Sequence, residues 1–223
     1  MKTSKFATQV AKLLLKIKAV QLNPTNPFTW SSGLRSPIYC DNRLILSLLK
    51  ERRIIVNMLG DVMDQIDSYP QMICGVATGA IGWGILLSEE EDICFGYART
   101  EKKSHGHRNQ LEGMFTSGES VLVVEDLIST GGSTMNVIQA LQDAQMKVVG
   151  VISLFSYGFT KAHQLFTEAG IEVISLCDFP TLLKVAKEEK YITDAEYILL
   201  ACWNVDPQIW SDTYVDNQIT ITQ

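Results

Sequence analysis

Two adjacent acids, followed by hydroxyls and glycines, are the residues of this chain most suited to chemistry. Glu125 and Asp126 follow an apolar run, 121–124, that reads as a buried strand. Three hydroxyls and two glycines come next, before a helical pattern that begins near residue 133: Ser129, Thr130, Gly131, Gly132 and Ser133. Carboxylates at the carboxyl end of a strand can accept hydrogen bonds from a diol, and they can hold the waters of Mg²⁺. Glycines allow the backbone to approach an anion, which a helix N-terminus also attracts. The segment therefore predicts a site for sugar hydroxyls and a phosphate group.

Other glycine-rich phosphate motifs do not fit this segment. No lysine follows the glycines, so the segment is not a Walker P-loop, and it lacks the spacing of the dinucleotide fingerprint. An ordinary turn between a strand and a helix, with a capping serine, would explain a bare acid-and-glycine pattern. The complete string is more specific than that pattern, which favours a binding site over a simple turn.

The string resembles the phosphoribosyl pyrophosphate (PRPP) signature of the type I phosphoribosyltransferases. That signature has four apolar residues, two acids, two apolar residues, and then Ser/Thr-Thr-Gly-Gly-Ser/Thr, which residues 121–133 match. The resemblance implies that Glu125 and Asp126 hold the ribose hydroxyls of PRPP, with Asp126 also offsetting positive charge in the reaction. It implies that residues 129–133 anchor the 5′-phosphate. Mg²⁺ is the implied cofactor, contacted by the two acids through water.

A basic loop precedes this string. Residues 99–108 carry a fixed charge of +3 in a chain whose formal net charge is −6, and the polar stretch 99–113 has no apolar period. Long loops of this kind are often lids, and cations beside a leaving pyrophosphate stabilise its growing charge. Arg99, Lys103, His105 and Gly106 match the R-x-x-x-K-x-H-G catalytic loop of the orotate phosphoribosyltransferases. The resemblance implies catalytic roles for Lys103, Arg99 and His105, a PRPP contact for Lys102, and a homodimer in which the 99–113 loop completes the partner's site.

Residues 28–39 give the second resemblance to that family. Their sequence, F-T-W-S-S-G-L-R-S-P-I-Y, resembles the family's base-binding hood segment, F-T-x-x-S-G-x-x-S-P-x-Y. We expect Tyr39 to stack on the orotate ring, and backbone N–H groups around Ser32 and Gly33, with Arg43 near, to take its carboxylate. In the family, the turn that corresponds to Thr78 and Gly79 holds the pyrophosphate through its backbone.

Several cations that many family members carry are replaced in this chain. Ser31, Thr78 and Thr100 stand at three such positions, and residues 156–159 lack the arginine that meets the base in many members. A phosphoribosyltransferase for another base, such as a purine, therefore stays open as an alternative. A PRPP-binding regulator without turnover is a further alternative. The negative net charge, the lack of a recognisable helix-turn-helix and the retained loop residues disfavour the regulator.

The elements that must position these residues alternate along the chain. Apolar runs predict strands at 72–76, 93–97, 121–124, 148–155 and 171–176. Helical periodicity predicts helices within 1–20, around 48–62, and at 81–88, 133–144 and 160–169. This alternation predicts an α/β fold with a mostly parallel sheet covered on both faces. The resemblance implies a type I phosphoribosyltransferase-like twisted sheet with a small N-terminal hood and a C-terminal helical extension. In that extension we expect helices at 181–190 and 194–203 and a short edge strand at 218–222.

Length and composition bound the remaining expectations. The chain of 223 residues suits one domain, divided into an N-terminal helix and hood (1–45), a PRPP-binding core (46–178) and a helical extension packed on it (179–223). No apolar run is long enough for a membrane helix, and the N-terminal lysines do not suit a signal peptide. The five scattered cysteines favour a reducing cytoplasm. The net charge of −6 argues against a nucleic-acid partner.

Overall fold

A central, mostly parallel sheet organises the molecule. The structure, a computed structural model, describes residues 1–30, 32–101 and 110–221, with side chains described up to residue 214. In these residues the sheet has seven strands in the order β1-β11-β10-β9-β6-β7-β8. Their bounds are Lys2–Thr3 (β1), Met72–Val76 (β6), Cys94–Ala98 (β7), Leu111–Glu112 (β8), Ser120–Ile128 (β9), Lys147–Ser156 (β10) and Val173–Asp178 (β11). The pairs are parallel except β7 with β8, so the predicted α/β class is confirmed.

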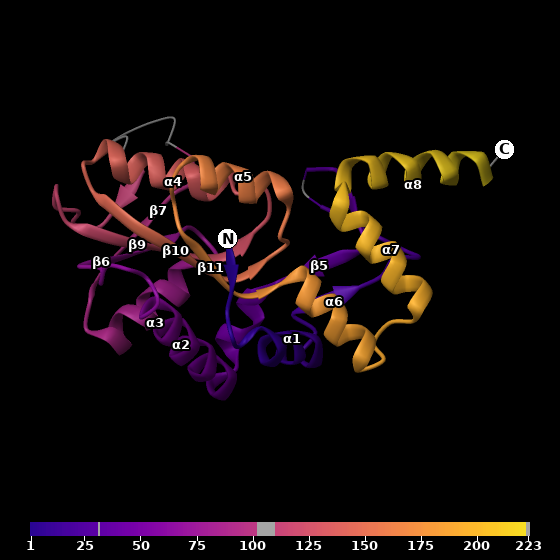
Figure 1. The fold of residues 1–223 in the computed structure, drawn as a ribbon, viewed down its shortest axis with the longest axis horizontal. Helices are drawn as coiled ribbons and strands as arrows, with labels where there is room; N and C mark the ends of the chain where they lie inside the picture. The colour runs from indigo at the N-terminus through magenta and orange to yellow at the C-terminus, as the bar shows by residue number, and fades with distance from the viewer. Residues whose placement is uncertain (31, 102–109, 222–223) are drawn as a thin grey trace.

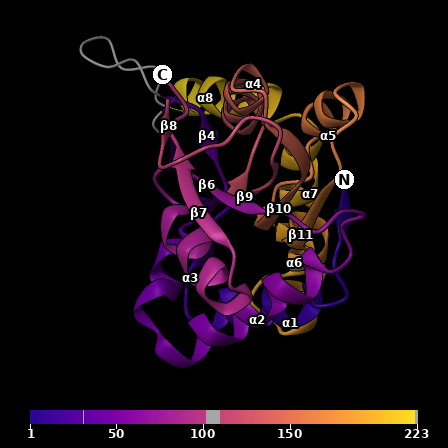
Figure 2. The ribbon, with the colours of Figure 1, turned by 90° about the vertical axis from the view of Figure 1, so that its left-hand side faces the viewer.

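Helices cover both faces of this sheet, as Figures 1 and 2 show. Helices α1 (Ala7–Lys16), α2 (Leu49–Met63) and α3 (Ile81–Glu91) lie on one side. Helices α4 (Gly132–Asp143) and α5 (Thr160–Glu168) lie on the other. Because both faces are covered, all five residues of β6 are buried, as expected for a central parallel strand. Two short strands, β1 and β8, were not predicted, because two residues carry no periodicity.

The N-terminal hood is built from two small antiparallel pairs. Strand β2 (Val20–Leu22) pairs with β5 (Ile38–Cys40), and β3 (Phe28–Thr29) pairs with β4 (Arg35–Ser36). A 3-10 helix, η1 (Asn42–Ser47), then leads from the hood into α2. The hairpin between β3 and β4 turns at Gly33, whose φ of +85° suits glycine. The two strand pairs and η1 thus form a small lobe at the N-terminal side of the fold.

The C-terminal extension consists of three consecutive helices, α6 (Phe179–Glu188), α7 (Asp194–Val205) and α8 (Pro207–Ile221). Helix α8 replaces the edge strand predicted at 218–222, so that prediction is wrong for the described residues. The physical reason lies at the start of α8. The Asp206 carboxylate accepts hydrogen bonds from the backbone N–H groups of Gln208 and Ile209, and Pro207 occupies the first helical position. Both features favour helix initiation.

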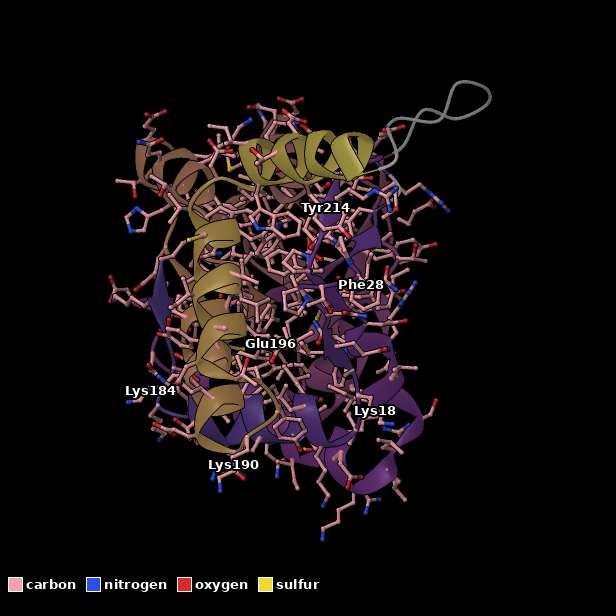
Figure 3. The ribbon with its side chains drawn as sticks, turned by 90° about the vertical axis from the view of Figure 1, so that its right-hand side faces the viewer. Lys18, Phe28, Lys184, Lys190, Glu196 and Tyr214 are labelled. Carbon is pink, nitrogen blue, oxygen red and sulfur yellow. The ribbon has the colours of Figure 1, made fainter. Side chains whose placement is uncertain are left out.

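An aromatic cluster joins the extension to the hood and the sheet. Trp203 of α7 is fully buried, and its ring centroid lies 5.9 Å from that of Trp30 in the hood and 5.5 Å from that of Tyr157 after β10. The Ser211 hydroxyl accepts a hydrogen bond of 2.9 Å from the Arg35 N–H. Figure 3 shows Tyr214 of α8 on the side of Phe28, and its hydroxyl donates to a hood carbonyl, that of Thr25, at 3.3 Å. Segments from both ends of the chain therefore hold one another.

Two findings bear on the cellular setting. None of the described helices has the length and hydropathy needed to cross a membrane. All five cysteines are free. The cytoplasmic location stays a prediction.

Candidate active site

The acid pair, Glu125 and Asp126, lies inside strand β9, which continues to Ile128 rather than ending at residue 124. Neighbouring side chains of a strand point to opposite faces. Glu125 turns toward α4, where the Thr134 hydroxyl donates to its Oε2 at 2.9 Å and the Asp126 N–H donates to its Oε1 at 3.0 Å. Burial, with the nearby Asp126 charge adding to it, raises the pKa of Glu125 well above its ordinary value. The two acids therefore differ in surroundings.

Asp126 faces the turn that follows β6. A Cβ added to Gly79 would collide with the Asp126 carboxylate, so the close approach of the two segments requires glycine. The Asp126 carbonyl accepts a hydrogen bond of 2.6 Å from Asn42 Nδ2, and the Asn42 side chain is buried. The peptide bond between Ala77 and Thr78 is cis. Contacts from the turn after β6 and from the start of η1 thus fix the position of Asp126.

The first cavity lies in front of these residues and has a volume of about 300 Å³. It brings together several residues that the sequence predicts for substrate: Arg43, Thr78, Gly79, Glu125, Asp126 and Ser133. Arg43 binds Asp41 through two hydrogen bonds, Nε to Oδ1 at 2.7 Å and an Nη to Oδ2 at 3.0 Å. This pairing lowers the pKa of the Asp41 carboxyl. The cavity therefore has a cation whose charge is already shared with a neighbouring acid.

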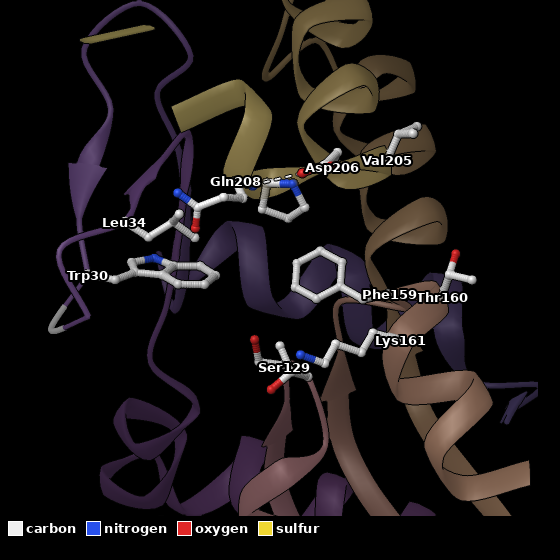
Figure 4. Close-up of a pocket in the computed structure, with 11 residues that line it drawn as sticks. Trp30, Leu34, Ser129, Phe159, Thr160, Lys161, Val205, Asp206 and Gln208 are labelled. Atoms are coloured by element: carbon white, nitrogen blue, oxygen red, sulfur yellow. Dashed lines mark hydrogen bonds between the residues drawn. The ribbon is translucent and has the colours of Figure 1, made fainter. Parts of the chain in front are cut away.

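The phosphate loop, residues 129–133, leads into the N-terminus of α4. Gly131 is the residue before that helix and has a φ of +82°, which few residues other than glycine adopt. The first amides of a helix have no intrahelical acceptor, so those after Gly131 face the loop as an anion site. Ser133 lines the first cavity, whereas Ser129 and Thr130 line a second cavity of about 440 Å³, shown in Figure 4. The loop thus contributes residues to both cavities.

The residues predicted to hold the base are more dispersed. Tyr39 is 40% exposed and packs on Phe28, with ring centroids 5.7 Å apart. Ser32 and Gly33 lie at the exposed tip of the β3–β4 hairpin. Among the described residues, neither that tip nor Tyr39 lines either cavity. Of the predicted base contacts, the structure places only Arg43 at the first cavity.

The basic loop is described only at its two ends. Arg99 follows β7, and its Nε donates to Glu112 Oε1 at 3.2 Å. This pair connects the start of the loop to β8, where it ends. Lys102, Lys103 and His105 lie outside the described residues, so their predicted roles stay predictions.

Several residues at the two cavities were not predicted from the sequence. Asp41 and Asn42 lie two and three residues after the hood string, and their position near it was an available signal. Thr134, which binds Glu125, lies one residue beyond the signature. Lys161 and Gln208 line the second cavity from distant parts of the chain, where neither residue stands in a motif.

An acid pair on a central strand, a phosphate loop at a helix N-terminus and a cavity between them define a phosphoribosyltransferase site. In agreement, the family model described as "Phosphoribosyl transferase domain" matches residues 45–175. An orotate phosphoribosyltransferase of Listeria monocytogenes serotype 4b (strain F2365) is 42% identical over 202 residues, 91% of this chain and 97% of the relative. One of Cutibacterium acnes is 41% identical over 211 residues, 95% and 98% of the two chains. This chain belongs to the orotate phosphoribosyltransferase family.

A solved structure agrees with this assignment. The orotate phosphoribosyltransferase from Aeropyrum pernix superposes with a TM-score of 0.72 at 30% identity, covering 82% of this chain and 99% of that one. The resemblance that the three sequence motifs indicated is therefore confirmed, and with it the type I phosphoribosyltransferase fold.

Proposed function

We propose that this protein transfers the 5-phosphoribosyl group of PRPP to orotate, giving orotidine 5′-monophosphate and pyrophosphate in pyrimidine biosynthesis. The observation that carries the proposal is the placement of Asp126 and Ser133, at the N-terminus of α4, around one cavity in a chain of this family. The Listeria and Cutibacterium relatives are named for this activity.

The reaction is a displacement at C1 of the ribose. The bond from C1 to the pyrophosphate oxygen breaks, and its electron pair leaves with the pyrophosphate. A ring nitrogen of the base loses its proton to the departing pyrophosphate and forms the new bond to C1. Amides of the phosphate loop hold the 5′-phosphate. Because this phosphate is held, C1 of the ribose is also fixed in position, which lowers the entropic cost of the reaction. Asp126 accepts hydrogen bonds from the ribose hydroxyls and offsets the positive charge that develops on the ring.

Mg²⁺ fits this site as a cation that arrives with the substrate. The described residues contain no cluster of three or more His, Cys, Asp or Glu side chains that could hold a metal ion. Mg²⁺ commonly binds through one or two carboxylates, waters and substrate phosphates. Both oxygens of Glu125 accept hydrogen bonds within the protein, so Asp126 is the better placed of the predicted pair to contact a hydrated ion. The ion would neutralise charge on the pyrophosphate.

The basic loop completes the proposal. Arg99, Lys103 and His105 would stabilise the leaving pyrophosphate, with Lys102 as a further PRPP contact. The support is their match to the family's loop string and the local charge of +3. We propose further that the protein is a cytoplasmic homodimer in which each 99–113 loop serves the partner's site.

One assay separates this function from its alternatives. The protein is incubated with PRPP, Mg²⁺ and, in turn, orotate, uracil, adenine, guanine and hypoxanthine, and nucleotide and pyrophosphate are measured. We expect nucleotide from orotate. Purine nucleotide without orotidine 5′-monophosphate would establish the purine alternative. PRPP binding without product from any base would establish a regulator.

A further inference from the structure

The second cavity is formed by segments from four parts of the chain. Trp30 and Leu34 contribute the hood wall, Ser129 and Thr130 the phosphate loop, Lys161 the start of α5, and Gln208 the start of α8 (Figure 4). Its volume of about 440 Å³ lies within the range of about 300–1,000 Å³ that small-molecule sites occupy. The described part of the first cavity's wall does not include these hood and C-terminal residues. The second cavity therefore has a lining of its own, although the phosphate loop contributes residues to both cavities.

Lys161, an exposed residue, places a positively charged group in the lining of this cavity. Figure 4 shows its ammonium group directed toward Ser129, across the cavity floor. Within the described ranges, the structure gives its Nζ no carboxylate or hydrogen-bond partner. The acid in the cavity wall, Asp206, accepts the N–H groups of Gln208 and Ile209 as the cap of α8. Lys161 also lies in the first turn of α5, where the helix dipole disfavours a cation. An anionic group of a ligand could therefore pair with Lys161 without displacing a carboxylate of the described residues.

The opposite wall is flat and aromatic. The Trp30 indole stacks on Tyr157, with ring centroids 5.3 Å apart and planes at 28°. Its Nε1 donates to the Ile38 carbonyl at 3.2 Å, which fixes the orientation of the ring. Such a surface favours contact with a planar ring. Together with Lys161, it suits a planar molecule that carries an anionic group.

We propose that Lys161 pairs with the carboxylate of orotate when the base lies against the hood in this cavity, which makes Lys161 a specificity-determining residue. The inference rests on the proposed function and deepens it. Because the cavity shares the phosphate loop with the first one, a nucleotide whose phosphate lies on the loop can reach both. Lys161 then supplies a positive charge in the second cavity, whereas Arg43, in the first cavity, is already paired with Asp41.

The test is a comparison of Lys161→Met and Lys161→Arg with the wild-type enzyme, using orotate and uracil as bases. A charge-assisted hydrogen bond contributes about 1.5–3 kcal/mol, so we expect Lys161→Met to raise KM for orotate about 10-fold or more. Uracil lacks the carboxylate, so its KM should hardly change, and KM for PRPP should stay within about 2-fold of wild type on the same reasoning. Lys161→Arg should restore most of the orotate affinity, because it keeps the charge.

The matched control is Lys147→Met, because Lys147 is an exposed lysine at the opposite, amino end of strand β10. It should leave every constant unchanged. Equal KM for orotate in wild type and Lys161→Met would overturn the inference, and a selective rise in KM for PRPP would reassign Lys161 to the phosphate. If the wild-type protein makes no nucleotide from orotate, the proposed function fails. Calorimetric titration of orotate into wild type and Lys161→Met then still decides the inference, since equal affinity overturns it and a selective loss supports it.

Discussion

Two neighbouring carboxylates of the signature have different surroundings because they lie on one strand. Glu125 is buried against Thr134 and carries a raised pKa, whereas Asp126 lines the cavity beside Gly79. The pleat of β9 determines this difference, since adjacent side chains point to opposite faces. At the scale of single residues, therefore, the acid pair combines a buried group that supports the strand with a group that can meet substrate.

Substitution of Glu125 by Gln should make stability less sensitive to pH. The folded protein retains the Glu125 proton to a higher pH than the unfolded chain, whose carboxyl has a pKa near 4.5. The contribution of protonated Glu125 to the free energy of unfolding is thus fully present below pH 4.5. It is lost as the pH rises through the pKa that Glu125 has in the folded protein. In thermal unfolding between pH 4 and 8, the difference in Tm between Glu125→Gln and wild type should grow in favour of the variant as pH rises. We expect a few degrees at pH 8, since about 1 kcal/mol shifts Tm by about 2–4 °C for a chain of this size. A difference that does not vary with pH would contradict a raised pKa.

Substitution of Gly79 by Ala should impair PRPP binding. The added Cβ would meet the Asp126 carboxylate, so either the turn after β6 or the acid must move. Because small misplacements in a catalytic site can cost about 10²-fold, we expect kcat/KM for PRPP to fall by about 10- to 100-fold. Steady-state kinetics with PRPP varied at saturating orotate measures this effect. An unchanged kcat/KM for PRPP would show that the turn after β6 can move away from Asp126 without impairing the use of PRPP.

The elements at the two ends of the chain combine to form one wall of the site. Helices α7 and α8 contact the hood through Trp203, Ser211 and Tyr214, and the start of α8 borders the second cavity. The C-terminal extension therefore contacts the hood and also borders the second cavity. The family model, by comparison, matches only residues 45–175.

Substitution of Ser211 by Ala tests this coupling between elements. The buried Ser211 hydroxyl accepts a hydrogen bond from the backbone N–H of Arg35. Without the hydroxyl this N–H would lose its partner, at a cost of about 1–3 kcal/mol in the free energy of unfolding. We expect a loss of that size in urea unfolding, together with a raised KM for orotate and little change in KM for PRPP. Ser117→Ala is the control, because Ser117 is exposed and bonds Gln145 elsewhere on the surface. Equal KM for orotate in Ser211→Ala and wild type would show that the hood does not depend on α8.

At the scale of the whole molecule, the proposed dimer has active sites that are each built from two subunits, and this sharing can be tested. If each 99–113 loop serves the partner's site, Lys103→Ala and Asp126→Asn damage different components of one shared site. We expect Lys103→Ala alone to lower kcat by about 10² or more, as expected for loss of transition-state charge stabilisation.

Mixing these two variants should restore activity. With free subunit exchange, half of the dimers are mixed and each mixed dimer has one intact site, so recovery should approach about one quarter of wild-type activity. Activity measured after co-incubation, or after co-unfolding and refolding, gives the result. Absence of recovery in a mixture shown to contain mixed dimers would mean that the loop serves its own subunit.

The sequence could predict those features whose residues lie close together along the chain. The β9 strand, the phosphate loop and α4 lie within about two dozen consecutive residues, so apolar pattern and motif sufficed for them. The prediction of an edge strand at 218–222 failed because the alternating string Gln-Ile-Thr-Ile-Thr has a β-like pattern. The cap at Asp206 instead starts a helix that continues to Ile221. The second cavity was beyond prediction, because Trp30, Lys161 and Gln208 meet only through tertiary packing.

The position of Trp30 in the wall of the second cavity has a spectroscopic consequence. Trp83 and Trp203, two of the other three tryptophans, are fully buried and away from solvent. An electron-poor ring resting on the Trp30 indole would quench its emission, while the buried indoles would continue to fluoresce. Intrinsic fluorescence of the unmodified protein can therefore follow ligand binding in the second cavity in real time. The Trp30→Phe variant, which lacks this indole, provides the reference signal.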